Sequence, residues 1–346
     1  HNKLLVPMMV STKAPYKTCV INEKERIIEP ISCNADNIGE YIKRIAAIYN
    51  EPDFDYIDWE NSEYLPTPTI VEAAQALYRG HNVHDITRSD AGAENLTVTT
   101  DEINRIVEHS KANNRKSICF VTGVPGAGKT LVGLNIAIQR SNAEKGEHAV
   151  FLSGNFPLVK VLQEALARDN VEQEKQRGNR ISKKDALRST SAFIQIIHKY
   201  RDSFVGNDNV PPERIAIFDE AQRSWTHDML EKFMSTKKGV ADFTYSEPEF
   251  LISTMDRHKD WAVIICLVGG GQEINTGEAG LPEWFDSIRR AFPDWDVYIT
   301  PQLNDDEYRR GRTWQSMIDG LNIYENKDLH LATSVRSFRT PDLAAF

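Results

Sequence analysis

Long apolar runs are missing from this sequence of 346 residues. The longest, Trp261–Val268, is far shorter than the roughly 20 apolar residues of a membrane-spanning helix. We therefore expect a protein with no membrane-spanning segment.

Cysteine is also scarce and scattered. No two of the cysteines form a C-x-x-C pair, and none stands beside a histidine at metal-ligand spacing, which disfavours a zinc site or a disulfide framework. Two of them lie in apolar runs typical of strands, which favours buried free thiols. This usage is typical of a reducing compartment, so we expect a cytoplasmic location. The four residues are Cys19, Cys33, Cys119 and Cys266, of which the last two lie in strand-like runs.

An excess of positive charge is absent too. The formal net charge is −9, which argues against coating nucleic acid through bulk charge but does not exclude a local basic groove. The hydrophobic fraction of 40% and the charged fraction of 26% are ordinary for a globular protein. A chain of this length holds two domains, or one large domain with an extension.

One stretch is locally basic. Between Lys175 and Arg188 only Asp185 opposes the positive charges. Contact with the phosphates of a nucleic acid is one hypothesis, and a solvated loop is the other. The basic residues are Lys175, Arg177, Arg180, Lys183, Lys184 and Arg188.

A glycine-rich stretch dominates what the sequence does contain. Residues 123–130 fit the phosphate-binding pattern G-x-x-x-x-G-K-[ST] at every fixed position. An apolar run of strand type, 117–122, precedes the stretch, and a buried-helix pattern, 131–138, follows it. Strand, glycine loop and helix are the context that this pattern requires. A chance glycine turn is the alternative that these flanks disfavour.

The pattern assigns a role to each residue type. Backbone N–H groups of the loop and the helix N-terminus would surround the phosphates of ATP. Lys129 would reach the β- and γ-phosphates, and the hydroxyl of Thr130 would hold Mg²⁺. The predicted nucleotide-binding residues are Gly123, Pro125, Gly126, Ala127, Gly128, Lys129, Thr130 and Leu131.

A second apolar run ends in two carboxylates. Residues 215–218 read Ile-Ala-Ile-Phe and lead into Asp219 and Glu220, the pattern of a Walker B strand. Asp219 would hold Mg²⁺, directly or through water, and Glu220 would orient and deprotonate the attacking water. The second carboxylate favours hydrolysis over simple phosphate transfer. An acidic turn between a strand and a helix is the alternative interpretation.

A third apolar run, 264–268, enters three glycines followed by Gln272. An amide that donates to a γ-phosphate oxygen can report whether the nucleotide is intact, and Gln272 is our candidate for this role. A glycine turn carrying a surface glutamine is the alternative.

Strand and helix patterns alternate through most of the chain. Alternation of this kind predicts an α/β fold with a parallel sheet between helices. We expect a small α+β unit at 1–50, a linker and helix at 51–90, the ATPase domain at 91–300 and a further segment at 301–346.

Local signals set several element boundaries. Two strands are expected to form a hairpin around Glu23-Lys24, and a helix at 38–49 is expected to be capped by Asn34 or Asp36, with its isoleucines on one face. Capping boxes predict helix starts at Thr69 and Thr99. The apolar residues of 193–200 predict part of a helix.

The three chemistry-bearing segments, in this order, resemble the motor core of superfamily 1 helicases. Residues 217–225, 246–257 and 269–281 narrow the match to the Schlafen group 3-like DNA/RNA helicase domain, over roughly 90–346. The resemblance implies a RecA-like P-loop NTPase, with 301–346 as the truncated start of a second RecA-like lobe. It further implies ATP hydrolysis with Mg²⁺ and action on DNA or RNA, single-stranded nucleic acid being favoured. It also implies that the segment 151–155 touches the nucleic-acid backbone.

The same resemblance implies an arginine acting from the second lobe. Ser334-Val335-Arg336 matches the segment whose arginine reaches the γ-phosphate, and Arg339 is the alternative residue. Two features depart from the family pattern. Glu102-Ile103-Asn104 stands where such motors carry an adenine-reading glutamine, and the sequence stops at Phe346 before the final arginine motif. We therefore expect a fragment, or a motor that needs a partner protein or the missing lobe.

Relatives in this family often carry a nuclease-like region of the PD-(D/E)xK type upstream. Residues 1–50 look like the tail of such a region, but its E-x-K signature is missing, so we assign no nuclease residues.

The function predicted from these residues is an ATP-driven helicase or translocase. The main alternative is an ATP-gated switch that regulates a partner or an attached nuclease without moving along a strand. A small-molecule kinase is a weaker alternative, because the sequence shows no acceptor-pocket signature.

Overall fold

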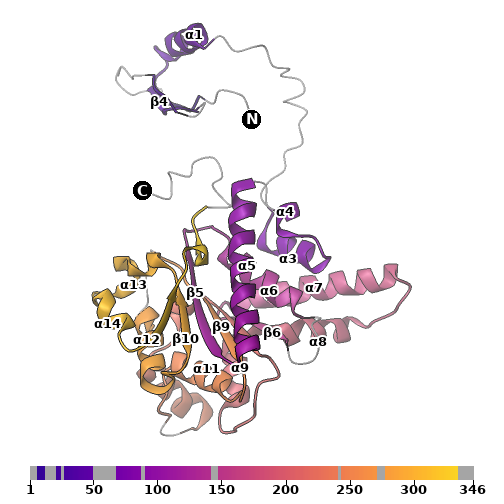
Figure 1. Cartoon of the computed structure of the whole chain (residues 1–346). Helices are drawn as coiled ribbons and strands as arrows, with labels where there is room; N and C mark the ends of the chain where they lie inside the picture. Colours follow the sequence, from indigo (N-terminus) through magenta and orange to yellow (C-terminus); the bar gives the residue numbers. More distant parts are fainter. Residues whose placement is uncertain are drawn as a thin grey trace. The chain divides into compact units, whose positions relative to one another are not determined.

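A computed structural model of the chain forms two compact units, His1–Leu65 and Pro66–Phe346, which are described separately (Figure 1). The residues that the structure describes are 6–11, 21–24, 27–49, 68–86, 90–141, 147–240, 243–270 and 277–333.

The first unit is a small α+β arrangement. Strand β1 (Met8–Val10) pairs in parallel with β4 (Ile31–Cys33). Strand β2 (Glu23–Lys24) pairs antiparallel with β3 (Ile27–Ile28). The predicted hairpin therefore forms, but Glu23 and Lys24 lie in its first strand and not in its turn.

Helix α1 (Ile38–Ile48) confirms the predicted helix but not its cap or its buried face. The N-cap residue is Asn37. Tyr41 and Ile45 are buried, whereas Ile42 and Ile48 are more than half exposed. The buried face of α1 therefore runs through Ile38, Tyr41 and Ile45, which pack in one apolar cluster.

The second unit is built on an eight-stranded sheet whose paired strands are all parallel. The strand order is β11-β10-β5-β9-β8-β6-β7, and β12 pairs with the end of β5. The strands are β5 (Lys116–Gly123), β6 (Ala149–Ser153), β7 (Ile194–Ile196), β8 (Ile215–Asp219), β9 (Ala262–Leu267), β10 (Asp296–Ile299), β11 (Asn322–Glu325) and β12 (His330–Leu331).

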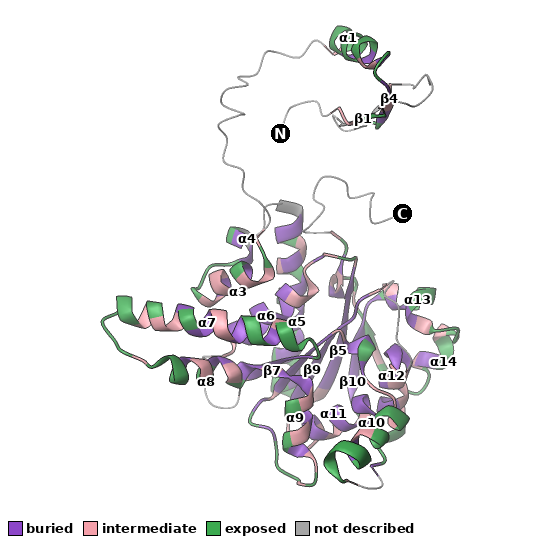
Figure 2. Cartoon of the chain, turned by 180° about the vertical axis from the view of Figure 1, so that it is seen from behind, coloured by how far each residue is buried: buried purple, intermediate pink, exposed green. Residues whose placement is uncertain are grey.

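Both faces of this sheet are buried. Side chains alternate along each strand, so Cys119 and Val121 of β5 join one apolar cluster while Ile118 and Phe120 join the other. Figure 2 shows the buried strands between layers of helices. Continuous apolar strands are the pattern of a parallel sheet covered on both sides. The predicted α/β fold with a parallel sheet between helices is confirmed.

Two sets of helices cover the sheet (Figure 1). The first apolar cluster contains residues of α3 (Ile70–Tyr78), α4 (Val83–Ile86), α5 (Asp90–Asn113), α6 (Lys129–Gln139) and α7 (Phe156–Gln176). The second contains residues of α9 (Ile197–Phe204), α10 (His227–Phe233), α11 (Glu247–Asp256), α12 (Gly280–Ala291), α13 (Asp306–Arg309) and α14 (Trp314–Ile318).

Helix α5 corrects one predicted boundary. The capping box at Thr69 opens α3 as predicted, with both reciprocal hydrogen bonds present. The similar signal at Thr99 does not open a helix, because α5 already begins at Asp90. The Thr99 hydroxyl instead donates to the carbonyl oxygen of Asp328 at 2.8 Å. A helix that packs against the core continues through a local start signal.

The segment 193–200 corrects a second prediction. It contains the end of α8 (Lys183–Phe193), the short strand β7 and the beginning of α9, and not a continuous helix. Strand β7 pairs with β6 at the edge of the sheet, and this pairing decides the conformation of a short apolar run that periodicity leaves open.

Helices α7 and α8 carry the basic stretch. All six of its positive residues are exposed, and most of them lie within the two helices or at their ends. This exposure fits the hypothesis of a solvated segment. The segment is mostly helical, however, and only the short connection between the helices is a loop.

Residues beyond 300 continue the same sheet, since β11 pairs with β10 and β12 pairs with β5. Where a second lobe begins stays a prediction. Among the described residues, no helix is both long enough and apolar enough to cross a membrane. The thiols of Cys119 and Cys266 are free and buried, as predicted.

Candidate functional site

The predicted phosphate loop connects β5 to α6 at the carboxyl edge of the sheet. Gly126 and Gly128 have φ values of 77° and 92°, a region that L-residues with a Cβ rarely occupy. The Ala127 N–H donates to the Val124 carbonyl at 3.0 Å and closes the turn. The loop therefore has the backbone that its glycines predict, with helix α6 beginning at Lys129.

The ammonium group of Lys129 folds back onto this loop. Its Nζ donates to the carbonyl oxygen of Gly123 at 2.7 Å and to that of Val124 at 3.4 Å. Burial lowers the pKa of Lys129, although the Glu220 and Asp219 carboxylates act in the opposite direction. A phosphate placed in the loop would supply a closer anion for this amine.

The two predicted metal ligands meet beside the loop. The Thr130 hydroxyl, on the first turn of α6, donates to Asp219 Oδ1 at 3.1 Å, across 89 residues of sequence. The Ser153 hydroxyl, at the end of β6, reaches Asp219 Oδ2 at 3.3 Å. Because β6 and β8 are parallel neighbours, both end at this edge of the sheet.

Asp219 is a buried carboxylate whose pKa is shifted in this arrangement. Its carboxylate is almost fully buried, and burial together with the negative charge of Glu220 raises the pKa of Asp219 to about 6. The hydrogen bonds from Thr130 and Ser153 act in the opposite direction. A cation at this position would stabilise the ionised carboxylate.

Glu220 follows directly in the left-handed region, with φ of 55°. This conformation is rare for a residue with a side chain and is often found at functional sites. Gln222 Nε2 donates to Glu220 Oε2 at 2.5 Å, and Gln222 Oε1 accepts from the Gly269 N–H at 3.1 Å. Sequence reasoning assigned no role to Gln222 and predicted no contact of Ser153 with Asp219, because the Gly269 and Asp219 partners lie 47 and 66 residues away.

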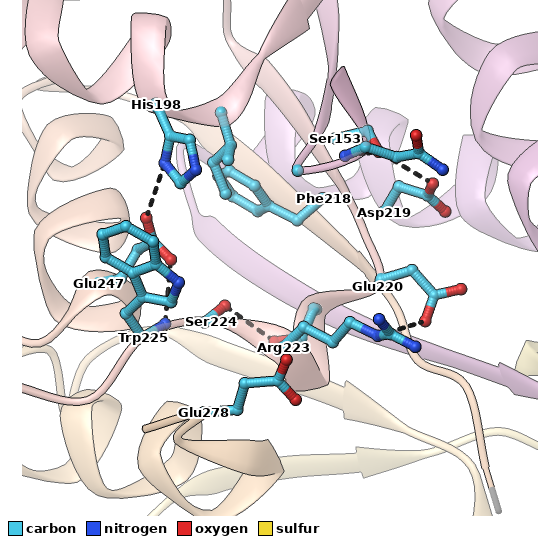
Figure 3. Close-up of a pocket in the computed structure, with 14 residues that line it drawn as sticks. Ser153, His198, Phe218, Asp219, Glu220, Arg223, Ser224, Trp225, Glu247 and Glu278 are labelled. Carbon is cyan, nitrogen blue, oxygen red and sulfur yellow. Dashed lines mark hydrogen bonds and ion pairs between the residues drawn. The ribbon is translucent and has the colours of Figure 1, made fainter. Parts of the chain in front are cut away.

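A cavity of about 450 Å³ opens on the other side of these carboxylates. Figure 3 shows Ser153 and Asp219 on one wall and His198 and Trp225 on the opposite wall. The His198 and Trp225 rings lie 4.9 Å apart between centroids. Gly154 and Asn155, which the family resemblance places against nucleic acid, also line the cavity.

Strand β12 approaches the phosphate loop from the far end of the chain. The Val124 N–H donates to the Leu331 carbonyl at 3.1 Å, and Thr122 Oγ1 lies 2.7 Å from His330 Nδ1. A Cβ on Gly123 would come within 2.7 Å of the Leu331 Cβ. The first glycine of the loop is therefore required for this close approach, a reason that the pattern alone does not give.

The remaining predicted site residues cannot be placed. Gln272, Arg336 and Arg339 lie outside the described residues. Gly123, Pro125, Gly126, Ala127, Gly128, Lys129, Thr130 and Leu131 form the loop and the first turn of α6, and Asp219 and Glu220 lie beside it.

The sheet and the loop place the chain in the class of α/β proteins with a parallel sheet and a glycine-rich turn at its carboxyl edge. A family model of the Schlafen group 3, DNA/RNA helicase domain matches residues 116–346, which is more than half of the chain. The chain belongs to this helicase-domain family, and its fold is consistent with a RecA-like helicase domain.

Among solved structures, the crystal structure of the Pyrococcus furiosus Hef helicase domain is similar to this chain at 16% sequence identity and a TM-score of 0.30. The match covers 60% of this chain and 40% of that one. Among curated proteins no match was found.

Proposed function

We propose that this chain hydrolyses ATP with Mg²⁺ and couples hydrolysis to action on DNA or RNA. The observation that carries the proposal is the 3.1 Å contact between Thr130 and Asp219. It joins the loop predicted to hold phosphates to the strand predicted to hold the metal. Membership of a DNA/RNA helicase-domain family supports the nucleic-acid part.

The residues present fit a magnesium ion. Mg²⁺ in nucleotide sites is held by one or two protein oxygens together with phosphates and waters. Thr130 Oγ1 and Asp219 Oδ1 are such oxygens, and the buried Asp219 carboxylate lacks a compensating cation at hydrogen-bond distance among the described residues. When bound, Mg²⁺ would neutralise negative charge on the phosphates.

Different protein groups then bind the phosphates and activate the attacking water. Backbone N–H groups of Gly126, Gly128, Lys129 and Thr130 bind the phosphates, and the Lys129 ammonium exchanges its carbonyl partners for phosphate oxygens. Glu220 accepts a proton from the attacking water as the water oxygen bonds to the γ-phosphorus, and ADP leaves. The wild-type products are ADP and inorganic phosphate.

The nucleic acid would run along the carboxyl edge of the sheet, past the 153–155 segment. Because the net charge is −9, affinity for nucleic acid has to come from local groups. We therefore expect only a few phosphate contacts, and a fall of the affinity with salt concentration that corresponds to those few contacts. Glu220 lines the same cavity as this segment and acts electrostatically on Lys129 of the loop, which favours coupling between the two ligands.

The test is the rate of phosphate release with and without single-stranded DNA or RNA at low salt. Stimulation of at least about tenfold by either polymer supports a helicase or translocase. Hydrolysis without stimulation by any nucleic acid would instead support the ATP-gated switch. Absence of any hydrolysis that depends on Lys129 would refute both proposals.

A further inference from the structure

Gln222 is a buried side chain beside Glu220, the predicted catalytic carboxylate. It lies on the 3₁₀ turn Ala221–Arg223, which begins directly after Glu220. The turn is fixed by the indole of Trp284, whose Nε1 donates to the Ala221 carbonyl at 2.9 Å. The Ser224 hydroxyl donates to the same carbonyl at 2.8 Å. Gln222 therefore projects from a rigid support.

The orientation of the Gln222 amide follows from its neighbours. The backbone N–H of Gly269 can only donate, so the atom facing it has to be the carbonyl oxygen Oε1. The NH₂ group then faces Glu220, where an ionised carboxylate can only accept. Both partners agree on one orientation, which leaves no ambiguity between the amide oxygen and nitrogen.

Glutamine suits this position because of its chemistry and its length. The link needs one donor and one acceptor at the end of a two-carbon side chain. Glutamate has no donor when ionised, asparagine is one methylene shorter, and lysine has no acceptor. The requirement is therefore for glutamine itself and not for a generic polar residue.

The far end of the link lies in a crowded segment. Val268 still pairs with β5, since its N–H donates to the Val121 carbonyl at 2.8 Å. Gly270, two residues later, packs against α13, because a Cβ there would meet the side-chain ends of Glu307 and Tyr308. Gly269 therefore lies between a residue held by the sheet and a residue packed against α13.

We propose that Gln222 is a positioning residue that holds the Glu220 carboxylate in place for hydrolysis and ties it to the Gly269 backbone at the end of β9. This inference rests on the proposed ATP hydrolysis and adds a residue to it. Gln222 holds Oε2, which leaves Oε1 of Glu220 to orient the water. Nucleotide binding, which uses the loop at 123–130, does not depend on the link.

The test compares three substitutions with the wild type. Gln222→Ala removes both hydrogen bonds, Gln222→Glu keeps the acceptor for Gly269 but removes the donor to Glu220, and Gln222→Asn keeps both groups at a shorter reach. We expect all three to lower kcat for ATP about 10- to 100-fold while KM and the Kd for a nucleotide analogue stay within about threefold. Gln315→Ala, on the exposed face of α14, is the matched control and should match the wild type.

Amide hydrogen exchange at Gly269 tests the contact without hydrolysis. Exchange should be faster in Gln222→Ala than in the wild type and should remain slow in Gln222→Glu. Unchanged exchange in Gln222→Ala, or a kcat within twofold of the wild type in an enzyme that Lys129→Ala inactivates, overturns the inference. A wild type with no ATP hydrolysis refutes the proposed function instead, and the exchange result then decides the Gln222 contact alone.

Discussion

The lysine of the phosphate loop is a half-buried amine that hydrogen-bonds to two backbone carbonyls. We expect Lys129→Ala to lower ATP turnover at least about 100-fold, because the cation that balances charge on the transferred phosphoryl group is lost. Folding stability should fall little, since burial already disfavours the charged amine. Phosphate release and thermal melting measure the two effects.

Lys111→Ala is the control for this substitution, because Lys111 pairs with Glu147 at the surface. It should leave turnover unchanged. Turnover retained in Lys129→Ala would contradict the site assignment.

The buried aspartate predicts a pH-dependent effect on stability. Since the folded protein raises the pKa of Asp219 from 3.8 to about 6, its ionised form destabilises the ligand-free fold above pH 6. The shift corresponds to about 3 kcal/mol as an upper value. We expect Asp219→Asn to stabilise the protein by roughly 1–3 kcal/mol at pH 7.5, and the gain to disappear as the pH falls through 6 towards 4.

Chemical denaturation at pH 7.5 and pH 4.5 measures this difference. Asp208→Asn, on an exposed side chain, should change stability by less than about 0.5 kcal/mol at either pH. A stability gain of Asp219→Asn that does not vary with pH would argue against a destabilising charge at Asp219.

At the scale of single residues, the sequence predicts those site residues that are contiguous in the chain. The loop at 123–130 and the pair Asp219-Glu220 are adjacent in sequence, and their types dictate their chemistry. The contacts of Gln222 with Gly269 and of Leu331 with Val124 join segments 47 and more than 200 residues apart, so no local pattern reveals them. Gln272 and Arg336 remain predictions.

At the scale of elements, helix α6 lies directly on the sheet at Gly133. A Cβ at this position would come within 2.7 Å of Leu267 Cδ1 and within about 3 Å of Ile217 and Phe151. Gly→Ala in a helix usually stabilises by up to about 1 kcal/mol. Here we expect Gly133→Ala to destabilise by roughly 1–3 kcal/mol, because the added methyl overpacks the core.

Denaturant unfolding checks the sign of this change. The contrasting substitution is Gly39→Ala in α1, where a Cβ meets nothing within 4 Å and where we expect no loss of stability. Equal stability of Gly133→Ala and the wild type would mean that α6 can move away from the sheet at little cost.

Elements were predictable where local chemistry and tertiary packing agree. The strands β8, β9 and β10 are apolar runs between polar turns, and the Thr69 cap stands at a helix start with no competing contact. Thr99 carries the same local signal within a longer helix, and Ile194–Ile196 forms a strand because β6 offers an edge. Long-range partners decided those two segments.

At the scale of the molecule, the second unit contains the whole described part of the candidate site. A chain that begins at residue 68 should therefore keep its nucleotide affinity within about twofold. A chain that begins at residue 91, the expected start of the ATPase domain, should be less stable. It loses α3, whose Tyr78 stacks on Phe193 and whose Arg79 Nε donates to the buried Asp169 at 2.7 Å.

Thermal melting and nucleotide binding of the two shortened chains distinguish these boundaries. Loss of nucleotide binding in the chain from residue 68 would show that the first unit contributes to the site. Equal melting temperatures of both chains would instead support the boundary at 91.

The position of β5 in the middle of the sheet has a consequence for synthesis. Its two long neighbours, β9 and β10, pair with it across 146 and 179 residues of sequence. At 5–20 residues per second a ribosome needs about 7–30 s to make the first of these spans. During that interval the apolar strand that leads into the phosphate loop has neither edge partner, so the nascent chain is a natural client for chaperones that shield unpaired strands.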